Sequence, residues 1–176
     1  MILINALALK LAFQLKEANP NHPASLDVLR YAIASIINTA GTAIVAIILS
    51  LLLGHFSGAA LALISFAVLR MISGGRHLES SIGCIVVTAS VANIIPYISL
   101  SVPINITITS VCIVLAYFFA PNNLERTSRI PTRYYPTLKY AAILLIAVNL
   151  LVRSDVLAVT FLIQCLSLIR KGGDTR

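Results

Sequence analysis

Long stretches without a charged side chain constrain the fold of this chain more than any other feature. Residues 31–53 are predominantly apolar and contain no Asp, Glu, Lys or Arg. An α-helix needs about 20 apolar residues to cross a hydrocarbon layer about 30 Å thick, and this run meets that length. Because backbone polar groups within lipid must be paired inside the chain, the run predicts a membrane-spanning helix.

The composition extends this prediction to the whole chain. Hydrophobic residues make up 59% of the sequence and charged residues 11%, with a mean hydropathy of +0.95. Globular domains are about 45–50% apolar and about 25% charged. A soluble fold of 176 residues could not bury so much apolar surface. We therefore expect an all-α polytopic membrane protein, in which residues 1–176 form a single membrane-embedded domain.

The apolar runs predict about six transmembrane helices and one helix at the membrane surface. Residues 1–18 carry a leucine at every fourth position from Leu3 to Leu15, which is typical of an interfacial helix. Pro96 is expected to kink the third span, and residues 101–103 to form a minimal turn. The last two spans are short, and they either cross the membrane or form one re-entrant hairpin. The predicted spans are residues 31–53, 56–70, 82–100, 104–120, 140–152 and 156–169.

The basic residues predict the orientation of the chain. With the N-terminus inside, the outer turns hold only Arg153, and the inner segments hold the rest of the 13 Lys and Arg residues. Because Lys and Arg are enriched in cytoplasmic loops, this asymmetry predicts cytoplasmic N- and C-termini. The polar segments 70–81 and 121–139 then both face the cytoplasm, where they can form the walls of a site. The inner basic residues are Lys10, Lys16, Arg30, Arg70, Arg76, Arg126, Arg129, Arg133, Lys139, Arg170, Lys171 and Arg176.

The stretch 70–84 is the most polar short window between two apolar runs, and it contains His77 and Cys84. A cysteine becomes an effective nucleophile once it is ionised, and a neighbouring imidazole favours the thiolate. In a straight helix the two residues would be separated by a rise of roughly 10 Å, whereas a base must come within about 3 Å of the thiol. We therefore expect His77 on a loop or re-entrant turn that folds over the start of the third span, which carries Cys84.

These two residues are candidates for the catalytic pair of a cysteine peptidase. Cys84 would attack a peptide carbonyl as a thiolate, and His77 would take its proton and later protonate the leaving amine. Backbone amides near Gly83 and Cys84 would donate hydrogen bonds to the oxyanion, because a helix N-terminus favours negative charge. The residues alone leave another interpretation open, in which His77 is an ordinary polar residue at the membrane boundary.

Other residues of this stretch are candidates for substrate binding or structural support. Gly74 and Gly75 permit close approach of an extended peptide, although a Gly-Gly pair is often only a turn. Arg70 would bind a substrate carboxylate through two parallel hydrogen bonds, or anchor the second span by reaching the head groups. A third group should orient His77, and the sequence does not choose among the local candidates Glu79, Ser80 and Ser81.

The spacing Arg70-x3-Gly74-Gly75-x-His77-x6-Cys84 resembles the signature of the accessory gene regulator B family. Members of this family are bacterial cell-membrane cysteine endopeptidases that process quorum-sensing propeptides. The resemblance implies that His77 and Cys84 are the catalytic pair, and that Arg70, Gly74 and Gly75 are needed for activity. It implies neither a metal nor a cofactor, and it is compatible with a homodimer.

The resemblance also implies a substrate and a reaction. Family members cut the C-terminal tail from a short propeptide that has an amphipathic N-terminal helix, an internal cysteine and an acidic tail. The acyl group passes to the enzyme cysteine, and the cysteine of the peptide then captures it as a thiolactone. The second polar segment of the family opens with Ala-Pro, which Ala120-Pro121 matches, whereas Asn123 stands where an aspartate is expected. Arginines replace the lysines of that segment, and the resulting candidates for binding the acidic tail are Arg126, Arg129 and Arg133.

Two non-enzymatic classes remain as alternatives. A small peptide exporter would need intramembrane charges for coupling, and the predicted spans contain essentially none. A non-catalytic membrane scaffold would tolerate the loss of His77 and Cys84, whereas a peptidase would not.

Other classes are disfavoured by the pattern of histidines, cysteines and charge. The HExxH motif of metal peptidases is absent, and His22, His55 and His77 are spread over both sides of the predicted membrane. The net charge of +7 lies between the spans, so it indicates contact with the lipid bilayer or an acidic peptide rather than nucleic acid. Cys112 and Cys165 lie inside apolar runs, which predicts unreactive packing residues.

Overall fold

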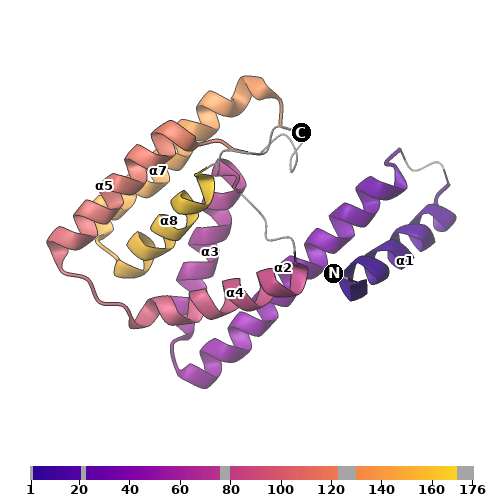
Figure 1. Cartoon of the computed structure of the whole chain (residues 1–176), viewed down its shortest axis with the longest axis horizontal. Helices are drawn as coiled ribbons and strands as arrows, with labels where there is room; N and C mark the ends of the chain where they lie inside the picture. The colour runs from indigo at the N-terminus through magenta and orange to yellow at the C-terminus, as the bar shows by residue number, and fades with distance from the viewer. Residues whose placement is uncertain (1, 21–22, 76–79, 123–129, 170–176) are drawn as a thin grey trace.

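The computed structural model describes residues 2–20, 23–75, 80–122 and 130–169, and these are almost entirely helical (Figure 1). The described residues contain no β-strand. Within them, one isolated β-bridge joins Gly74 and Asn122. The elements are α1 (Ile2–Ala18), α2 (Leu26–Leu53), α3 (Phe56–Ser73), α4 (Ser81–Ile94), η1 (Ile95–Tyr97), α5 (Val102–Phe119), η2 (Thr132–Tyr134), α7 (Tyr135–Val152) and α8 (Asp155–Leu168).

Four of the helical segments are long and apolar enough to cross a membrane. They are α2, α3, α5 and the segment Thr132–Val152, while Ser81–Tyr97 and α8 are shorter apolar helices. Large apolar side chains point outward along them, and Leu151 is 85% exposed. Such a surface is stable only in contact with lipid, so the predicted all-α polytopic membrane protein is confirmed.

Local capping chemistry moves the beginnings of two predicted spans. α2 begins at Leu26 rather than at residue 31, because the Ser25 side chain accepts a hydrogen bond from the Val28 amide. The predicted minimal turn at residues 101–103 is wrong, because Pro103 lies in the first turn of α5. Proline fits there because its missing N–H would have no intrahelical acceptor.

The third predicted span, residues 82–100, is not one kinked helix. α4 ends at Ile94, and one 3-10 turn, η1, follows before the chain becomes extended. Pro96 explains this end, because it has no N–H to donate to the carbonyl of Ala92. The expectation that Pro96 only kinks a continuous helix is therefore wrong.

The two predicted short spans at 140–152 and 156–169 differ from one another. α7 begins at Tyr135 and, together with η2, is long enough to cross a membrane, so the predicted short span there is wrong. α8 stays short, as expected, and it packs mainly against α3 and α5 rather than against α7. The two segments therefore do not form a hairpin of their own.

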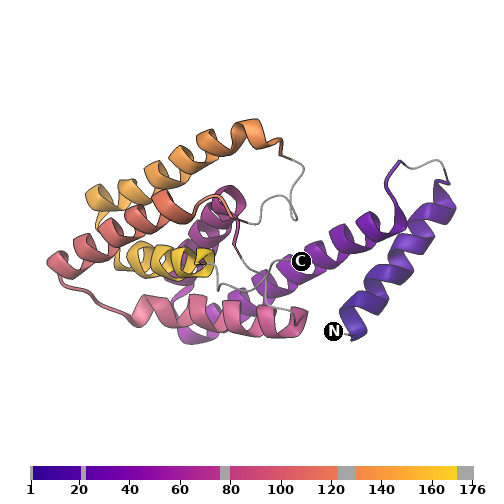
Figure 2. The same ribbon diagram turned by 45° about the horizontal axis from the view of Figure 1, so that its top comes forward.

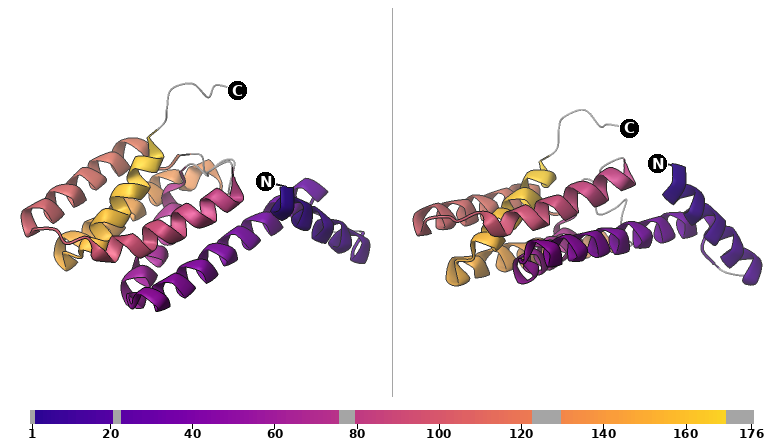
Figure 3. Two further views of the ribbon diagram at one scale, coloured as in Figure 1. Left: turned by 60° about the horizontal axis from the view of Figure 1, so that its bottom comes forward. Right: turned by 90° about the horizontal axis from the view of Figure 1, so that it is seen from below.

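Helix α3 stands at the centre of the arrangement and contacts α2, α4, α7 and α8 (Figure 1). On one side, α4 lies along α2, and α1 packs against α2 in an arm that projects from the rest (Figure 3). On the other side, α5 packs against both α7 and α8 (Figure 2). α1 forms over the predicted range, and its placement at the membrane surface stays a prediction.

The interior core lies where α3, α5, α7 and α8 meet. Its fully buried side chains include Leu69, Ile146 and Phe161. Cys112 and Cys165 belong to the same core, and the Cys165 thiol donates to the Cys112 carbonyl at 3.6 Å. Both cysteines are completely buried, as the apolar runs around them predict.

Candidate active site

Cys84 lies in the first turn of α4, at the start of the third apolar segment, as predicted. Ser80 is the N-cap of this helix: the Gly83 amide donates to the Ser80 hydroxyl at 3.2 Å, and the Cys84 amide donates to the Ser80 carbonyl at 2.8 Å. The thiol is half-buried, and its sulfur lies 4.0 Å from the Thr88 hydroxyl. The cap therefore fixes the position of Cys84, the predicted nucleophile, at the positive end of a helix dipole.

The same cap corrects the prediction for the oxyanion donors. The amides of Gly83 and Cys84 both donate to Ser80, so they are not available to a developing oxyanion. Helix geometry instead leaves the earlier amides of Ser81 and Ile82 without intrahelical acceptors. Ser80, which the sequence offered as one candidate for orienting His77, serves as the helix cap in the described structure.

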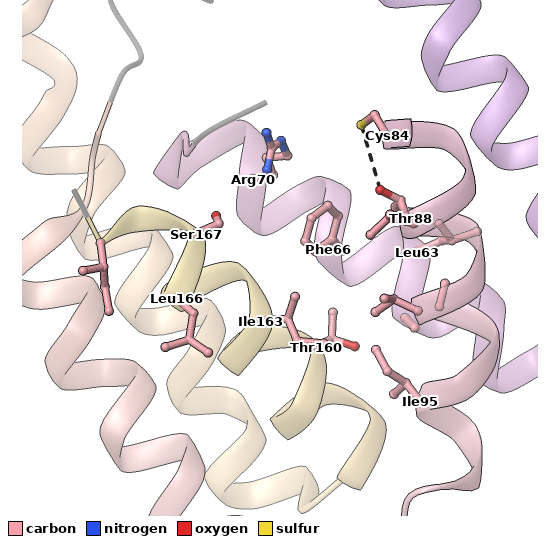
Figure 4. Close-up of a pocket in the computed structure, with 15 residues that line it drawn as sticks. Leu63, Phe66, Arg70, Cys84, Thr88, Ile95, Thr160, Ile163, Leu166 and Ser167 are labelled. Carbon is pink, nitrogen blue, oxygen red and sulfur yellow. Dashed lines mark hydrogen bonds between the residues drawn. The ribbon is translucent and has the colours of Figure 1, made fainter. Parts of the chain in front are cut away.

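A cavity of about 730 Å³ lies between α3, α4 and α8, with Cys84 in its wall. Figure 4 shows the Arg70 guanidinium and the Cys84 thiol at the same end of this cavity, on facing helices. The guanidinium carbon of Arg70 lies 5.7 Å from the centre of the Phe66 ring, which holds the charge over an aromatic face. The lining residues are Ala62, Leu63, Phe66, Arg70, Cys84, Val87, Thr88, Val91, Ala92, Ile95, Thr160, Ile163, Leu166, Ser167 and Ile169.

The predicted glycine pair forms a tight turn at the end of α3. Gly74 and Gly75 have φ angles of 75° and 122°, which residues with a side chain rarely adopt. A Cβ atom on Gly75 would lie 2.8 Å from the Ser167 hydroxyl and 3.3 Å from the Gln164 amide nitrogen. It would also lie 3.7 Å from the Arg70 guanidinium, so Gly75 sits between α8 and Arg70. Both the backbone angle and the close approach therefore require glycine at position 75.

Gln164 of α8 holds this turn in place from inside the protein. Its side chain is completely buried, and its Nε2 donates to the Gly74 carbonyl at 2.7 Å and to the Ser73 hydroxyl at 3.1 Å. The Gln164 side-chain oxygen accepts from Ser167 at 3.3 Å. Because buried amides cost free energy unless they are hydrogen-bonded, these contacts fix the turn and α8 to each other.

The second polar segment reaches the same turn. The Gly75 amide donates to the Asn122 carbonyl, and the Asn122 amide donates to the Ser73 carbonyl, both at 3.0 Å. The Asn122 side chain donates to the Leu168 carbonyl at 2.8 Å. The described parts of segments 70–81 and 121–139, which the sequence allows to form the walls of one site, therefore meet at Gly74, Gly75 and Asn122.

The structure brings only some of the predicted site residues together. Arg70 and Cys84 line the same end of the cavity, which we call its mouth (Figure 4), with Gly75 beside Arg70 and Ser80 at the start of α4. Arg133 is exposed at η2, where it donates to the Tyr134 hydroxyl at 2.9 Å, and it does not line the cavity. His77, Glu79, Arg126 and Arg129 lie outside the described residues.

Two residues of α8 belong to the site and were missed from the sequence. Gln164 holds the glycine turn, and Thr160 lines the cavity with a hydroxyl that has no hydrogen-bond partner in the described structure. A signal existed for Gln164, because an amide side chain inside an apolar span is costly and is usually kept for a reason. Threonine is common in apolar helices, so nothing in the sequence singled out Thr160.

Comparison with known proteins agrees with the motif. The sequence model of the accessory gene regulator B family matches residues 4–169, which is nearly the whole chain. The chain belongs to the accessory gene regulator B family. It is also 33% identical over 82 residues to an AgrB-like protein of Halalkalibacterium halodurans, an alignment that covers 47% of this chain and 42% of that relative. No solved structure matches the chain.

Several residues of the family motif lie close together in the structure. Of the motif residues of this accessory gene regulator B chain, Arg70, Gly75 and Cys84 lie around one cavity mouth, and Gly74 is fixed by Gln164 beside it. These residues come from α3, α4 and the turn at the end of α3. Their roles in a reaction stay predictions.

Proposed function

We propose that this chain is a membrane cysteine endopeptidase that removes the C-terminal tail of a quorum-sensing signal-peptide precursor. The observation that carries the proposal is the shared cavity mouth of Cys84 and Arg70, at the N-terminus of α4. His77, the proposed base, belongs to the short segment that joins the glycine turn to the cap at Ser80. Only four residues of sequence separate the turn from the cap, and His77 is one of them.

The proposed reaction forms one carbon–sulfur bond to Cys84 and then breaks it. His77 takes the thiol proton, and the thiolate attacks the carbonyl carbon of the peptide bond. The carbon–nitrogen bond breaks, the tail leaves as an amine that takes the proton from His77, and a thioester to Cys84 remains. The cysteine thiol of the bound peptide then gives its proton to His77 and attacks this thioester. The carbon–sulfur bond to Cys84 breaks, Cys84 takes the proton from His77, and a cyclic thiolactone is closed.

Charge favours an acidic tail at the proposed site. Arg70 lies at the cavity mouth, where its planar guanidinium suits a carboxylate. The chain carries a net charge of +7, and the predicted orientation places nearly all basic residues on the cytoplasmic side. We propose that both termini are cytoplasmic, and that an amphipathic propeptide reaches the site along the membrane surface.

The test is a cleavage assay in a heterologous host that produces the chain together with the small peptide encoded beside its gene. Propeptide size is followed by gel for the wild type, Cys84→Ala and His77→Ala. We expect both substitutions to abolish cleavage while membrane insertion stays normal. Cys112→Ala is the matched control, because this thiol is completely buried in the core, and it should leave cleavage intact.

Survival of cleavage in Cys84→Ala would remove the proposed mechanism. The chain would then be tested as a peptide exporter or a scaffold, by measuring secretion of the peptide rather than its size. If Cys112→Ala abolished cleavage just as Cys84→Ala does, the assay would be reporting folding rather than chemistry.

A further inference from the structure

The cavity beside Cys84 continues far below the thiol. Cys84 and Ile95, the residue directly after α4, both line it, and eleven helical residues correspond to a rise of about 16 Å. Val87 and Val91 line the same wall, one and two turns below Cys84. A groove this deep exceeds what attack on a carbonyl at its mouth requires. Its volume of about 730 Å³ instead lies within the range of sites that enclose a ligand.

The charge and polarity of the wall change with depth. Among the described residues that line the cavity, Arg70 alone is charged, and it lies at the mouth with Cys84 (Figure 4). Below the mouth, the wall is formed mainly by apolar side chains of the three helices. An occupant that runs past Cys84 therefore has its acidic part at the mouth and its apolar part in the depth.

One polar group in the deep wall has an unmet hydrogen-bonding capacity. Thr160 is 1% exposed, and its hydroxyl has no partner in the described structure. Figure 4 shows this hydroxyl directed from α8 toward the α4 side of the cavity. A buried hydroxyl without a partner is unfavourable, and an occupant that supplies a partner removes that cost.

We infer that this cavity is the acyl-side subsite, which holds the large apolar side chains immediately before the cleaved bond, with Thr160 hydrogen-bonding to the bound peptide at its base. The inference rests on the proposed function, and it names the substrate class of the same site. The leaving tail stays with Arg70 at the mouth, and the apolar side chains descend between α4 and α8. The depth of the cavity then selects bulky apolar residues over small ones.

A lipid acyl chain explains the cavity less well. An acyl chain has no hydrogen-bonding group to offer Thr160, and its binding would not require the cavity to begin at Cys84. A peptide has backbone and side-chain polar groups along its whole length, and it must pass Cys84 to be cleaved. A peptide therefore fits the cavity better than a lipid acyl chain does.

Two adjacent valines provide the test. Val87 lines the cavity one turn below Cys84, and Val86 does not; their exposed fractions are 50% and 53%. After the cleavage site of the propeptide is mapped by mass spectrometry, the residue before it is set to Phe, Leu or Ala. Val87→Phe should lower kcat/KM for the Phe and Leu peptides relative to the Ala peptide by about 10-fold or more. Val86→Phe should leave these ratios within about 2-fold of the wild type.

An equal loss for all three peptides in Val87→Phe would overturn the inference, because the cavity would then hold something other than the substrate side chain. The same holds if Val86→Phe and Val87→Phe change the ratios alike. Absence of cleavage in the wild-type protein would instead contradict the proposed function, so the two failures are distinguishable.

Thr160→Val gives a second and independent readout. If the hydroxyl bonds only to bound peptide, its removal should raise the Tm of the free protein and lower kcat/KM by about 5- to 10-fold. Thr160→Ser, which keeps the hydroxyl, should restore most of the activity. An unchanged kcat/KM in Thr160→Val would overturn the proposed hydrogen bond to the peptide. A lowered Tm would show that the hydroxyl serves the fold instead.

Discussion

Helices α4 and α8 are built alike, yet they place different groups at their N-termini. Each has 14 residues, is apolar, and is too short to count among the four long spans. Each begins with a serine cap: Ser80 accepts from the Gly83 amide at 3.2 Å, and Ser154 accepts from the Leu157 amide at 3.4 Å. The local signal that starts both helices is therefore the same.

The first residue of each helix makes the difference. In α8 it is Asp155, whose carboxylate accepts from the Leu100 amide at 3.1 Å and from the Asn105 side chain at 2.8 Å. Asn105 is bonded in turn to Asn149, which also donates to Thr109 at 3.0 Å. This carboxylate is surrounded by donors from other elements, so the start of α8 is a closed structural joint.

In α4 the first residue is Ser81, and the first turn contains no acidic residue. Within the described residues, no acidic side chain occupies the first turn of α4, and a negative charge would arise there when Cys84 is ionised or attacks a carbonyl. One helix thus uses its positive end for stability, while the other leaves it open for the proposed reaction. Four predictions test this comparison.

The largest effect is expected at Gly75, where α8 packs against the glycine turn beside the candidate active site. Gly75→Ala places a Cβ 2.8 Å from the Ser167 hydroxyl at a φ of 122°, so the turn must move away from α8 and Arg70. Cleavage should fall by about 100-fold, because small displacements of catalytic groups are costly. Gly54→Ala is the matched control: Gly54 also has a positive φ, 72°, but nothing lies within 4 Å of its Cβ position. It should lower stability slightly and leave cleavage by the folded protein unchanged; equal effects of both changes would contradict the proposed support.

The next effect concerns the closed joint of α8. In Asp155→Asn, one side-chain oxygen becomes an NH₂ group that faces the Leu100 amide or the Asn105 side chain, both of which are donors. The free energy of unfolding should fall by about 2–3 kcal/mol, measured as a lower Tm in detergent. The folded fraction should cleave the propeptide at the normal rate. A variant that keeps its Tm but loses cleavage would place Asp155 in the reaction and remove the contrast between the two helices.

Making α4 resemble α8 should separate stability from activity. Ser81→Asp places a carboxylate at the first position of α4, where it should stabilise the helix by about 0.3–1 kcal/mol. The same charge disfavours a thiolate at Cys84 and an oxyanion beside it, so cleavage should fall by about 10-fold. Ser81→Asn, which keeps the size without the charge, should retain activity. If Ser81→Asp is as active as Ser81→Asn, the N-terminus of α4 has no electrostatic role in the reaction.

The smallest effect is expected from removing the caps themselves. Ser80→Ala and Ser154→Ala should each lower the free energy of unfolding by about 1 kcal/mol, since both hydroxyls accept one first-turn amide. Thermal unfolding of the two variants should therefore agree. Cleavage by the folded protein should fall only in Ser80→Ala, because the Ser80 cap positions Cys84. Unequal thermal effects would show that the two caps themselves differ, and not only the first residues of their helices.

Much of the helical pattern is determined by the residues alone. Apolar runs set the number and approximate extent of the helices, because lipid requires paired backbone groups over a fixed thickness. The motif from Arg70 to Cys84 also identified the family and placed the thiol at the start of a helix. Helix ends were less predictable, because hydropathy registers neither the cap hydrogen bond of Ser25 nor the missing N–H groups of Pro96 and Pro103.

The apolar runs and the motif spacing were thus enough for the fold class, the family and the position of Cys84 at the start of a helix. The cavity and the roles of Thr160 and Gln164 depend on how α8 is placed against α3 and α4. Gln164 meets Gly74 across 90 positions of sequence, so no local pattern could predict that contact. Helices in lipid are apolar on every side, and hydropathy therefore does not show which side faces the interior. Packing between helices makes that choice, and with it decides which residues surround Cys84.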